Sequence, residues 1–121
     1  MTPLGERLRE LRAQRGVTQA EMADGLGVSS AYLSALEHGH RGVPSWSFLQ
    51  RLVGYFNLIW DDAEELQALA AISHPRVVVD TAGLPSETTR LANKLAATVA
   101  ELSPEDCAEI EQLLDELSRK G

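Results

Sequence analysis

The chain has 121 residues, a formal net charge of −7 and 44% hydrophobic residues. This length allows one domain of ordinary size, or a small domain followed by an oligomerisation appendage, and the pattern below fits the second arrangement better. No apolar run approaches the roughly 20 residues that span a bilayer, and no N-terminal run resembles a signal peptide, so we expect a cytoplasmic protein without a membrane segment. The single cysteine, Cys107, excludes an internal disulfide.

A first helix is predicted at the start of the chain. Pro3 occupies a plausible first helical position, because proline lacks an N–H that would go unbonded there anyway. Leu4, Leu8 and Leu11 recur on one face, and the helix should end before Gly16. This helix therefore presents an apolar face to a core and charged faces to solvent.

The next stretch, residues 18–39, predicts two short helices joined by a tight turn. Thr18 is the expected N-cap of the first, with Glu21 in the capping-box position. Gly27 follows as a glycine that readily adopts the left-handed conformation at a helix end, and Ser29 caps the next helix. The inward-facing positions are Met22, Ala23, Leu26, Leu33 and Leu36. Two helices in this arrangement form a helix-turn-helix.

Two further helices follow a loop at residues 38–44. Ser45 is the expected N-cap of a fourth helix ending at Asn57, and Asp62 is the expected N-cap of a fifth, with Glu65 in its capping box. The apolar positions are Trp46, Leu49, Leu52, Val53 and Phe56 in the fourth helix and Leu66, Leu69 and Ile72 in the fifth. Acidic residues 61–65 fit the positive end of a helix dipole far better than a catalytic or metal site.

A linker with a short extended segment is predicted over residues 74–85, between a domain at 1–73 and a helical region at 86–121. Its β-branched run consists of Val77, Val78 and Val79. A single strand has no sheet of its own. It should therefore pair with another element, lie across a domain face, or meet its own copy in a dimer.

The last 36 residues predict a two-helix hairpin. Ser86 caps the sixth helix, and Ser103 and Pro104 open the seventh, so the connection is very short. The apolar stripes are Leu91, Leu95, Val99 and Leu102 in the sixth helix and Ile110, Leu113, Leu114 and Leu117 in the seventh. Such a hairpin is too small to bury both stripes alone, so it should pack on its own domain or, as we favour, on a second subunit.

The charge is unevenly distributed. Residues 1–58 carry six basic and five acidic side chains, whereas residues 59–121 carry five basic and thirteen acidic ones. The acidic excess therefore lies outside the helix-turn-helix and does not argue against DNA binding by that segment. It does predict weak non-specific affinity, because few phosphates can be neutralised.

The helix-turn-helix resembles a known family. The matching positions are Thr18, Gln19, Glu21, Ala23, Gly27, Val28, Leu33, Ser34, Glu37, His38 and Gly39. At this spacing the chain resembles the xenobiotic-response-element type of helix-turn-helix, which includes the lambda-like phage repressors and Cro. The resemblance covers about residues 4–73 and implies an all-α fold whose N-terminal part is a lambda-repressor-like five-helix DNA-binding domain.

The resemblance also implies which residues contact DNA. The third helix would lie in the major groove, Gln19 at the start of the second helix would bind a phosphate, and the loop after the third helix would contact the sugar-phosphate backbone. The residues so assigned are Thr18, Gln19, Ser29, Ser30, Ala31, Tyr32, Ser34, Ala35, His38, His40 and Arg41. It further implies a partly buried Arg12–Glu37 salt bridge that braces the first helix against the third.

The base-facing positions depart from those of strong sequence readers. Ser30, Ala31 and Ser34 cannot form the bidentate contacts that Arg, Lys, Asn or Gln make with guanine or adenine. We therefore expect modest direct readout, with shape and water contributing to specificity. The alternative is that these small side chains pack against a protein surface.

The favoured function is a dimeric transcriptional regulator, most simply a repressor of a pseudo-palindromic operator. The alternative is an antitoxin or interaction module of the same fold that binds a protein partner through its acidic C-terminal half. An enzyme is disfavoured, because no phosphate-binding glycine loop and no nucleophile beside a histidine is present. We expect no cofactor, and no metal, because no cysteine or acidic residue lies at ligand spacing from the histidines.

Overall fold

The computed structural model describes residues 1–120, which form an all-α protein. It divides into two compact units, residues 1–77 and 78–121. The first unit contains α1 (Pro3–Arg15), α2 (Gln19–Leu26), α3 (Ser30–Glu37), α4 (Trp46–Tyr55) and α5 (Trp60–Ala71). The second contains α6 (Ser86–Thr98), the short 3₁₀ helix η1 (Val99–Glu101) and α7 (Pro104–Lys120).

The first three helices begin and end where the sequence predicts. Pro3 opens α1, and Gly16 ends it in the left-handed region with φ 72°. The reciprocal capping box between Thr18 and Glu21 opens α2, and Gly27 ends it at φ 71°. The Ser29 hydroxyl accepts a hydrogen bond from a backbone N–H in the first turn of α3. Local capping chemistry therefore accounts for the turn between α2 and α3.

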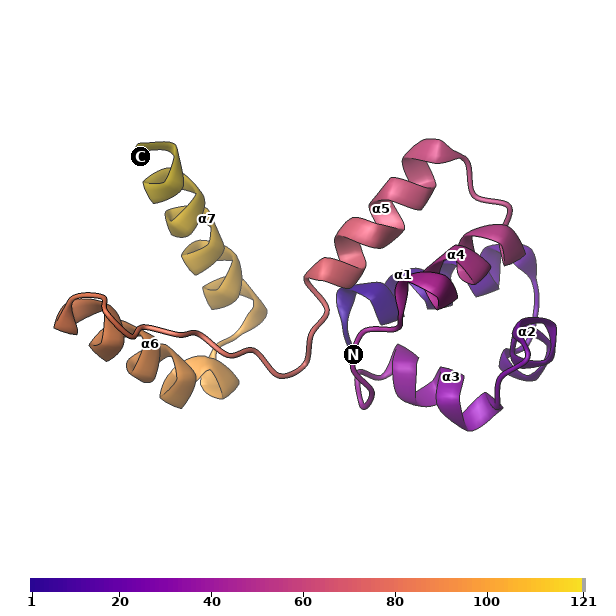
Figure 1. Cartoon of the computed structure of the whole chain (residues 1–121), viewed down its shortest axis with the longest axis horizontal. Coiled ribbons are helices and arrows are strands. Elements are labelled where there is room, and N and C mark those ends of the chain that lie inside the picture. Colours follow the sequence, from indigo (N-terminus) through magenta and orange to yellow (C-terminus); the bar gives the residue numbers. More distant parts are fainter. Residues whose placement is uncertain (121) are drawn as a thin grey trace. The chain divides into compact units, whose positions relative to one another are not determined.

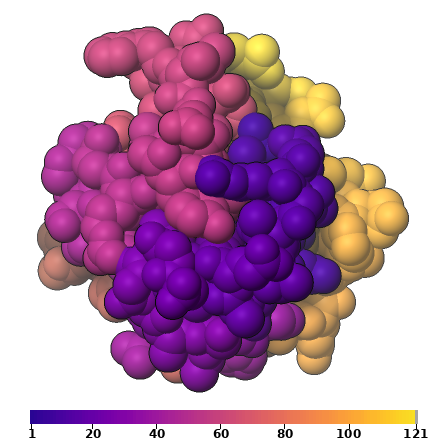
Figure 2. All heavy atoms as spheres, turned by 90° about the vertical axis from the view of Figure 1, so that its right-hand side faces the viewer, coloured from indigo at the N-terminus to yellow at the C-terminus, as the bar shows by residue number. Residues whose placement is uncertain are grey.

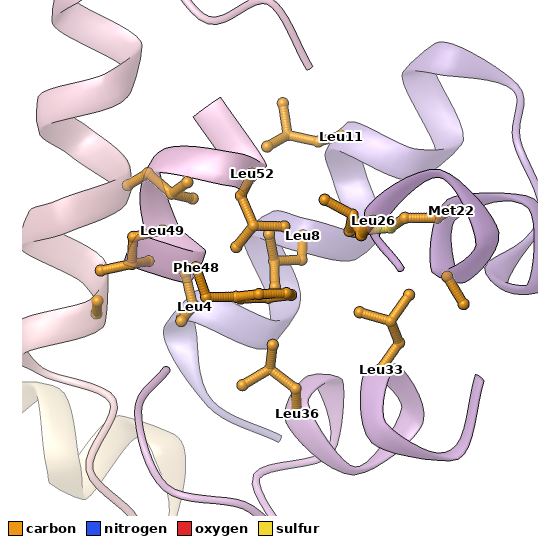
Figure 3. Close-up of a cluster of buried hydrophobic side chains, with 13 residues drawn as sticks. Leu4, Leu8, Leu11, Met22, Leu26, Leu33, Leu36, Phe48, Leu49 and Leu52 are labelled. Carbon is orange, nitrogen blue, oxygen red and sulfur yellow. The ribbon is translucent and has the colours of Figure 1, made fainter. Parts of the chain in front are cut away.

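The five helices of the first unit surround one core (Figures 1 and 3). α1 packs against α3 and α5, and α2 packs against α3 and α4. Side chains from these helices converge on the centre, where Leu52 is fully buried and Leu4 and Leu8 are nearly so. The remaining core residues are Leu11, Met22, Ala23, Leu26, Leu33, Leu36, Phe48, Leu49, Leu66 and Ala70. The predicted leucine faces of α1, α2 and α3 are thus confirmed.

Two glycines permit close packing between these helices. A Cβ on Gly5 would lie 2.1 Å from the backbone carbonyl oxygen of Glu37, so α1 meets the end of α3 almost backbone to backbone. A Cβ on Gly25 would lie 2.6 Å from the ring of Tyr55. In the space-filling view of Figure 2, the purple surface of α2 lies beside the magenta surface of α4, against which it packs.

The predictions for α4 and α5 were partly wrong. Ser45 caps α4 as expected, but Trp46 is 63% exposed and Phe48 takes the core position. α5 starts at Trp60, earlier than predicted, because the backbone N–H of Ala63 already bonds the carbonyl oxygen of Ile59. Asp62 therefore lies inside the first turn and is not the N-cap.

The same shift changes the roles of other α5 residues. Glu65 lies beyond the capping-box position and forms an ion pair with Arg7, with 3.5 Å between Oε1 and Nε. Ile72 follows the end of the helix and is 68% exposed, whereas the small side chain of Ala70 is buried one turn after Leu66. The predicted apolar stripe of α5 is thus correct at Leu66 and wrong at Ile72.

Ser73 joins the end of α5 to the beginning of α1. Its hydroxyl accepts a hydrogen bond from the backbone N–H of Leu4 at 2.9 Å and donates one to the carbonyl oxygen of Leu69 at 2.5 Å. Ser73 is buried, so both backbone groups obtain a partner that water does not provide. This hydroxyl thus links the last helix of the first unit, α5, to the start of its first helix, α1.

The second unit has exposed helices. Ser86 is the first residue of α6, with Pro85 as its N-cap, so the predicted serine cap is wrong. The 3₁₀ helix η1 interrupts the expected continuous stripe, and Leu102 lies beyond it. Backbone hydrogen bonding at the start of α6 and a bond from the Ser86 hydroxyl lower the pKa of Glu87.

Ser103 and Pro104 open α7 as predicted. The Ser103 hydroxyl and the Asp106 carboxylate exchange hydrogen bonds with each other's backbone N–H groups. α6 and α7 diverge from their short connection and do not lie side by side (Figure 1). No residue of α6 or α7 that the structure describes is buried.

The valine run adopts no strand. Val77, Val78 and Val79 are 74%, 92% and 67% exposed. The boundary between the two units falls within this run, inside the linker predicted at 74–85. Over residues 1–120, no helix is both long and apolar enough to span a membrane.

Candidate nucleic-acid interface

The start of α3 presents short side chains to solvent. Ser29, Ser30 and Ala31 are exposed, and Ser34 and Ala35 further along the helix are half-buried. Their opposite neighbours Leu33 and Leu36 anchor the helix in the core. α3 is therefore anchored in the core on one side and presents a narrow surface of short side chains on the other.

Tyr32 lies between the core and the loop that follows α3. Its ring meets that of Phe48 edge to face, with centroids 5.5 Å apart. The guanidinium of Arg41 lies 5.5 Å from the centroid of the Tyr32 ring. A cation over an aromatic face gains on the order of 0.5–1 kcal/mol at an exposed site, so this contact favours one position of Arg41 beside α3.

Gln19 and the capping box lie at the amino-terminal end of α2. Gln19 is half-buried, and its side-chain amide nitrogen lies 3.3 Å from Oε1 of Glu37. The Thr18 hydroxyl oxygen accepts its capping bond from the backbone N–H of Glu21, which leaves its O–H able to donate. Gln19 likewise retains a second amide N–H for a ligand such as a phosphate.

The structure confirms the salt bridge between α1 and α3. Nη2 of Arg12 lies 3.1 Å from Oε1 and 3.4 Å from Oε2 of Glu37, and Glu37 is only 2% exposed. Nε of Arg12 is buried and has no hydrogen-bond partner. The pair braces the helices, and loss of either partner would leave the other charge largely uncompensated.

His38 and His40 are both exposed beyond the end of α3. Nδ1 of His38 lies 2.7 Å from the carbonyl oxygen of Ser34, so this nitrogen carries the proton and Nε2 faces away. The two imidazole rings stack with centroids 6.3 Å apart. With exposed Arg41, they make the segment that follows α3 polar and accessible to solvent.

Sequence reasoning missed Arg51. Its guanidinium lies 5.5 Å from the centroid of the Phe48 ring, on the aromatic pair that also carries Arg41. Within the described residues, neither arginine forms a salt bridge. The i, i+3 spacing of Phe48 and Arg51 on α4 was a signal for this contact, but the burial of Phe48 was needed to recognise it.

Across residues 1–120, no three His, Cys, Asp or Glu side chains gather into a possible metal site.

The residues assigned to dimerisation lie on surfaces accessible to a partner. Leu91, Leu95 and Val99 of the second unit are 64%, 41% and 52% exposed. Leu113, Leu114 and Leu117 are also exposed, and Leu102 and Ile110 are half-buried.

Comparison with known proteins identifies the family. The helix-turn-helix domain family matches residues 3–69. The chain is 36% identical over 62 residues to the uncharacterized HTH-type transcriptional regulator RghRB of Bacillus subtilis, a match that covers 51% of this chain and 45% of that protein. It is 42% identical over 52 residues to the HTH-type transcriptional repressor RghR of the same organism, which covers 43% of this chain and 38% of RghR.

A third relative is the HTH-type transcriptional regulator SinR of Bacillus subtilis, with 33% identity over 49 residues, 40% of this chain and 44% of SinR. The chain thus spans less than half the length of these curated relatives. The family match, in contrast, takes in more than half of the chain, including α2, the turn at Gly27 and α3. The protein therefore belongs to the helix-turn-helix family, of the xenobiotic-response-element type.

Proposed function

We propose that the protein is a sequence-specific DNA-binding transcriptional regulator that acts in the cytoplasm. In this proposal, α3 enters the major groove of the DNA. The outward face of α3 carries this proposal, because Ser29, Ser30 and Ala31 are exposed at its start while Leu33 and Leu36 hold it from behind. A helix with short outward side chains can approach base edges without steric conflict.

Phosphate contacts supply most of the affinity in this proposal. Gln19 at the start of α2 contacts Glu37 in the last turn of α3, and His38, His40 and Arg41 follow that turn, so these polar residues lie next to the carboxyl end of α3. Such contacts fix the position of a protein on DNA without reading sequence. Arg51 adds a further cation next to the same aromatic pair.

We further propose a homodimer that represses transcription by occupying a pseudo-palindromic operator. The exposed apolar residues of α6 and α7, with the valine run before them, supply the dimer contacts. Two linked half-sites compensate for weak readout at each, because binding the first raises the effective concentration of the second. RghR, whose matched segment is 42% identical, is named a transcriptional repressor, which supports this direction of regulation.

The test is selection of bound fragments from a genomic library by the purified chain, followed by titration of a labelled duplex that carries the recovered sequence. Enrichment of one inverted repeat, with affinity that falls steeply as salt rises, is the expected result. Recovery of fragments without a common sequence would contradict sequence-specific regulation. A shuffled duplex of equal length is the control.

A second candidate is an interaction module or antitoxin that binds a protein partner. The exposed apolar residues of α7 lie among six acidic side chains, which suits a basic, partly apolar surface. Co-purification of a stoichiometric partner from the source cells, together with loss of that partner on Leu113→Glu, would favour this candidate. A chain that purifies as a homodimer alone would favour the regulator.

A further inference from the structure

Three helices of the first unit converge on one buried carboxylate. Glu37, in the last turn of α3, is 2% exposed. Its Oε1 atom lies 3.1 Å from Nη2 of Arg12 on α1 and 3.3 Å from the amide nitrogen of Gln19 on α2. Glu37 therefore contacts Gln19 in addition to forming the salt bridge with Arg12.

The bond to Glu37 determines which way the Gln19 amide faces. An ionised carboxylate only accepts hydrogen bonds, so Gln19 must turn its NH₂ group, and not its carbonyl oxygen, toward Glu37. One N–H then bonds Oε1, while the second remains free to donate. Ordering a glutamine side chain loses conformational entropy, and this bond restricts the side chain before DNA arrives, so less entropy is lost on binding.

Arg12 makes this arrangement compatible with an anionic ligand. A lone carboxylate behind Gln19 would repel a phosphate, but the guanidinium of Arg12 contacts both oxygens of Glu37 and offsets its charge. Phosphate can therefore approach Gln19 without facing an uncompensated negative charge. Glu37 itself lies away from solvent, where salt screens its interaction with Arg12 little.

We propose that Glu37 is a positioning residue for DNA binding: it holds the Gln19 amide at the start of α2 so that the free N–H donates to a DNA phosphate. This inference rests on the proposed function, because it assumes that Gln19 faces the DNA backbone. Glu37 would then contribute to DNA affinity through Gln19, besides bracing α1 against α3.

The first test is a double-mutant cycle on operator affinity with Glu37→Gln, Gln19→Ala and the combined variant of the full chain. Gln19→Ala should weaken binding about tenfold, as expected for a lost hydrogen bond to a charged group. Glu37→Gln removes a negative charge near DNA, so electrostatics alone predicts tighter binding. If Glu37 positions the Gln19 amide, Glu37→Gln should instead weaken binding. In a chain that already carries Gln19→Ala, adding Glu37→Gln should cause no such weakening.

A matched variant separates positioning from loss of the brace. Replacing both members of the salt bridge, in Arg12→Met with Glu37→Met, leaves the net charge unchanged, and buried ion pairs often tolerate apolar replacement without loss of stability. This variant should fold and bind several-fold more weakly. Leu11→Ala, which destabilises the core without removing a polar contact of Glu37, controls for general loosening. If Glu37→Gln weakened operator binding equally in the wild-type chain and in the Gln19→Ala variant, the proposal would be overturned.

The second test needs no DNA. In the ¹⁵N-labelled full chain, the two side-chain amide protons of Gln19 should differ in chemical shift more than those of Gln50, which is exposed on α4. Glu37→Gln should reduce that difference, and an unchanged difference would overturn the positioning role. If the wild-type chain selects no DNA while this spectroscopic result holds, the proposed function fails and the Glu37–Gln19 contact stands.

Discussion

At the scale of single residues, side chains that join helix ends contribute more than their size suggests. Ser73 is a small polar residue beyond the last turn of α5, yet its hydroxyl bonds two backbone groups that are 65 residues apart, those of Leu4 and Leu69. A buried donor or acceptor that loses its partner destabilises the fold by the cost of its desolvation. Such residues therefore affect stability out of proportion to the area they bury.

Ser73→Ala should lower the free energy of unfolding by about 1–3 kcal/mol, because the N–H of Leu4 then lacks an acceptor. Chemical denaturation of the full chain, monitored by the fluorescence of Trp46 and Trp60 in the first unit, measures this change. Ser30→Ala, at an exposed position of α3, is the control and should change stability by under about 0.5 kcal/mol. Equal stabilities for the two variants would contradict the role of Ser73.

Ala31→Glu should abolish operator binding without unfolding the first unit. Ala31 is exposed at the start of α3, so a carboxylate there costs little in the free protein but faces base edges and phosphates in the complex. Ala13→Glu introduces the same charge at an exposed position of another helix, α1, and is the control. Comparable affinities for both variants would show that α3 does not read DNA.

At the scale of helices and their connections, the sequence predicted the elements that local chemistry determines. Capping side chains and left-handed glycines set the bounds of α2 and the start of α3, and these were correct. The predicted start of α5 was wrong. No side chain caps this helix, so its first residue is not marked by a local capping signal in the sequence. A plausible cap at Asp62 therefore misled the prediction.

The candidate site was predictable only in part. The outward positions of α3 follow from the helical period once Leu33 and Leu36 face inward. The contacts of Arg41 with Tyr32 and of Gln19 with Glu37 join segments whose distance depends on how the helices pack. Ala70 was missed because a short side chain gives a weak apolar signal, although it allows close approach between α5 and the core.

Tyr32→Leu should weaken DNA binding several-fold and reduce its dependence on salt, because Arg41 loses the ring that favours its position beside α3. Tyr32→Phe keeps an aromatic face and should retain most of the affinity. Fluorescence anisotropy at several salt concentrations measures both quantities. Wild-type salt dependence in Tyr32→Leu would show that Arg41 does not need the ring to reach a phosphate.

Leu95→Glu in α6 and Leu113→Glu in α7 should each convert the proposed dimer to a monomer, because a charge would then be buried in the subunit contact. Sedimentation at micromolar concentration measures the change. Ala97→Glu and Gln112→Glu add charge at exposed positions outside the apolar stripes, and should leave the dimer intact. A dimer that persists in both leucine variants would exclude α6 and α7 from the contact.

At the scale of the whole molecule, a two-fold dimer places a constraint on its DNA. Two copies of α3 enter major grooves on one face of the duplex only if their half-site centres lie about one helical turn, roughly 34 Å, or a multiple of it apart. Inserting about half a helical turn between the half-sites should therefore reduce affinity strongly, whereas a full turn should restore part of it. Equal affinity for all three spacings would refute the symmetric dimer.

The bonds of Ser73 also determine where the chain can be cut for biophysical dissection. The family match ends at residue 69, two residues before α5 itself ends. A fragment that stops there omits Ser73 and leaves the N–H of Leu4 without its acceptor, although it keeps nearly all of the apolar core. A fragment that ends at residue 75 retains both bonds. A fragment made to test whether the five-helix unit folds alone should therefore include Ser73, which lies beyond the residues that the family match covers.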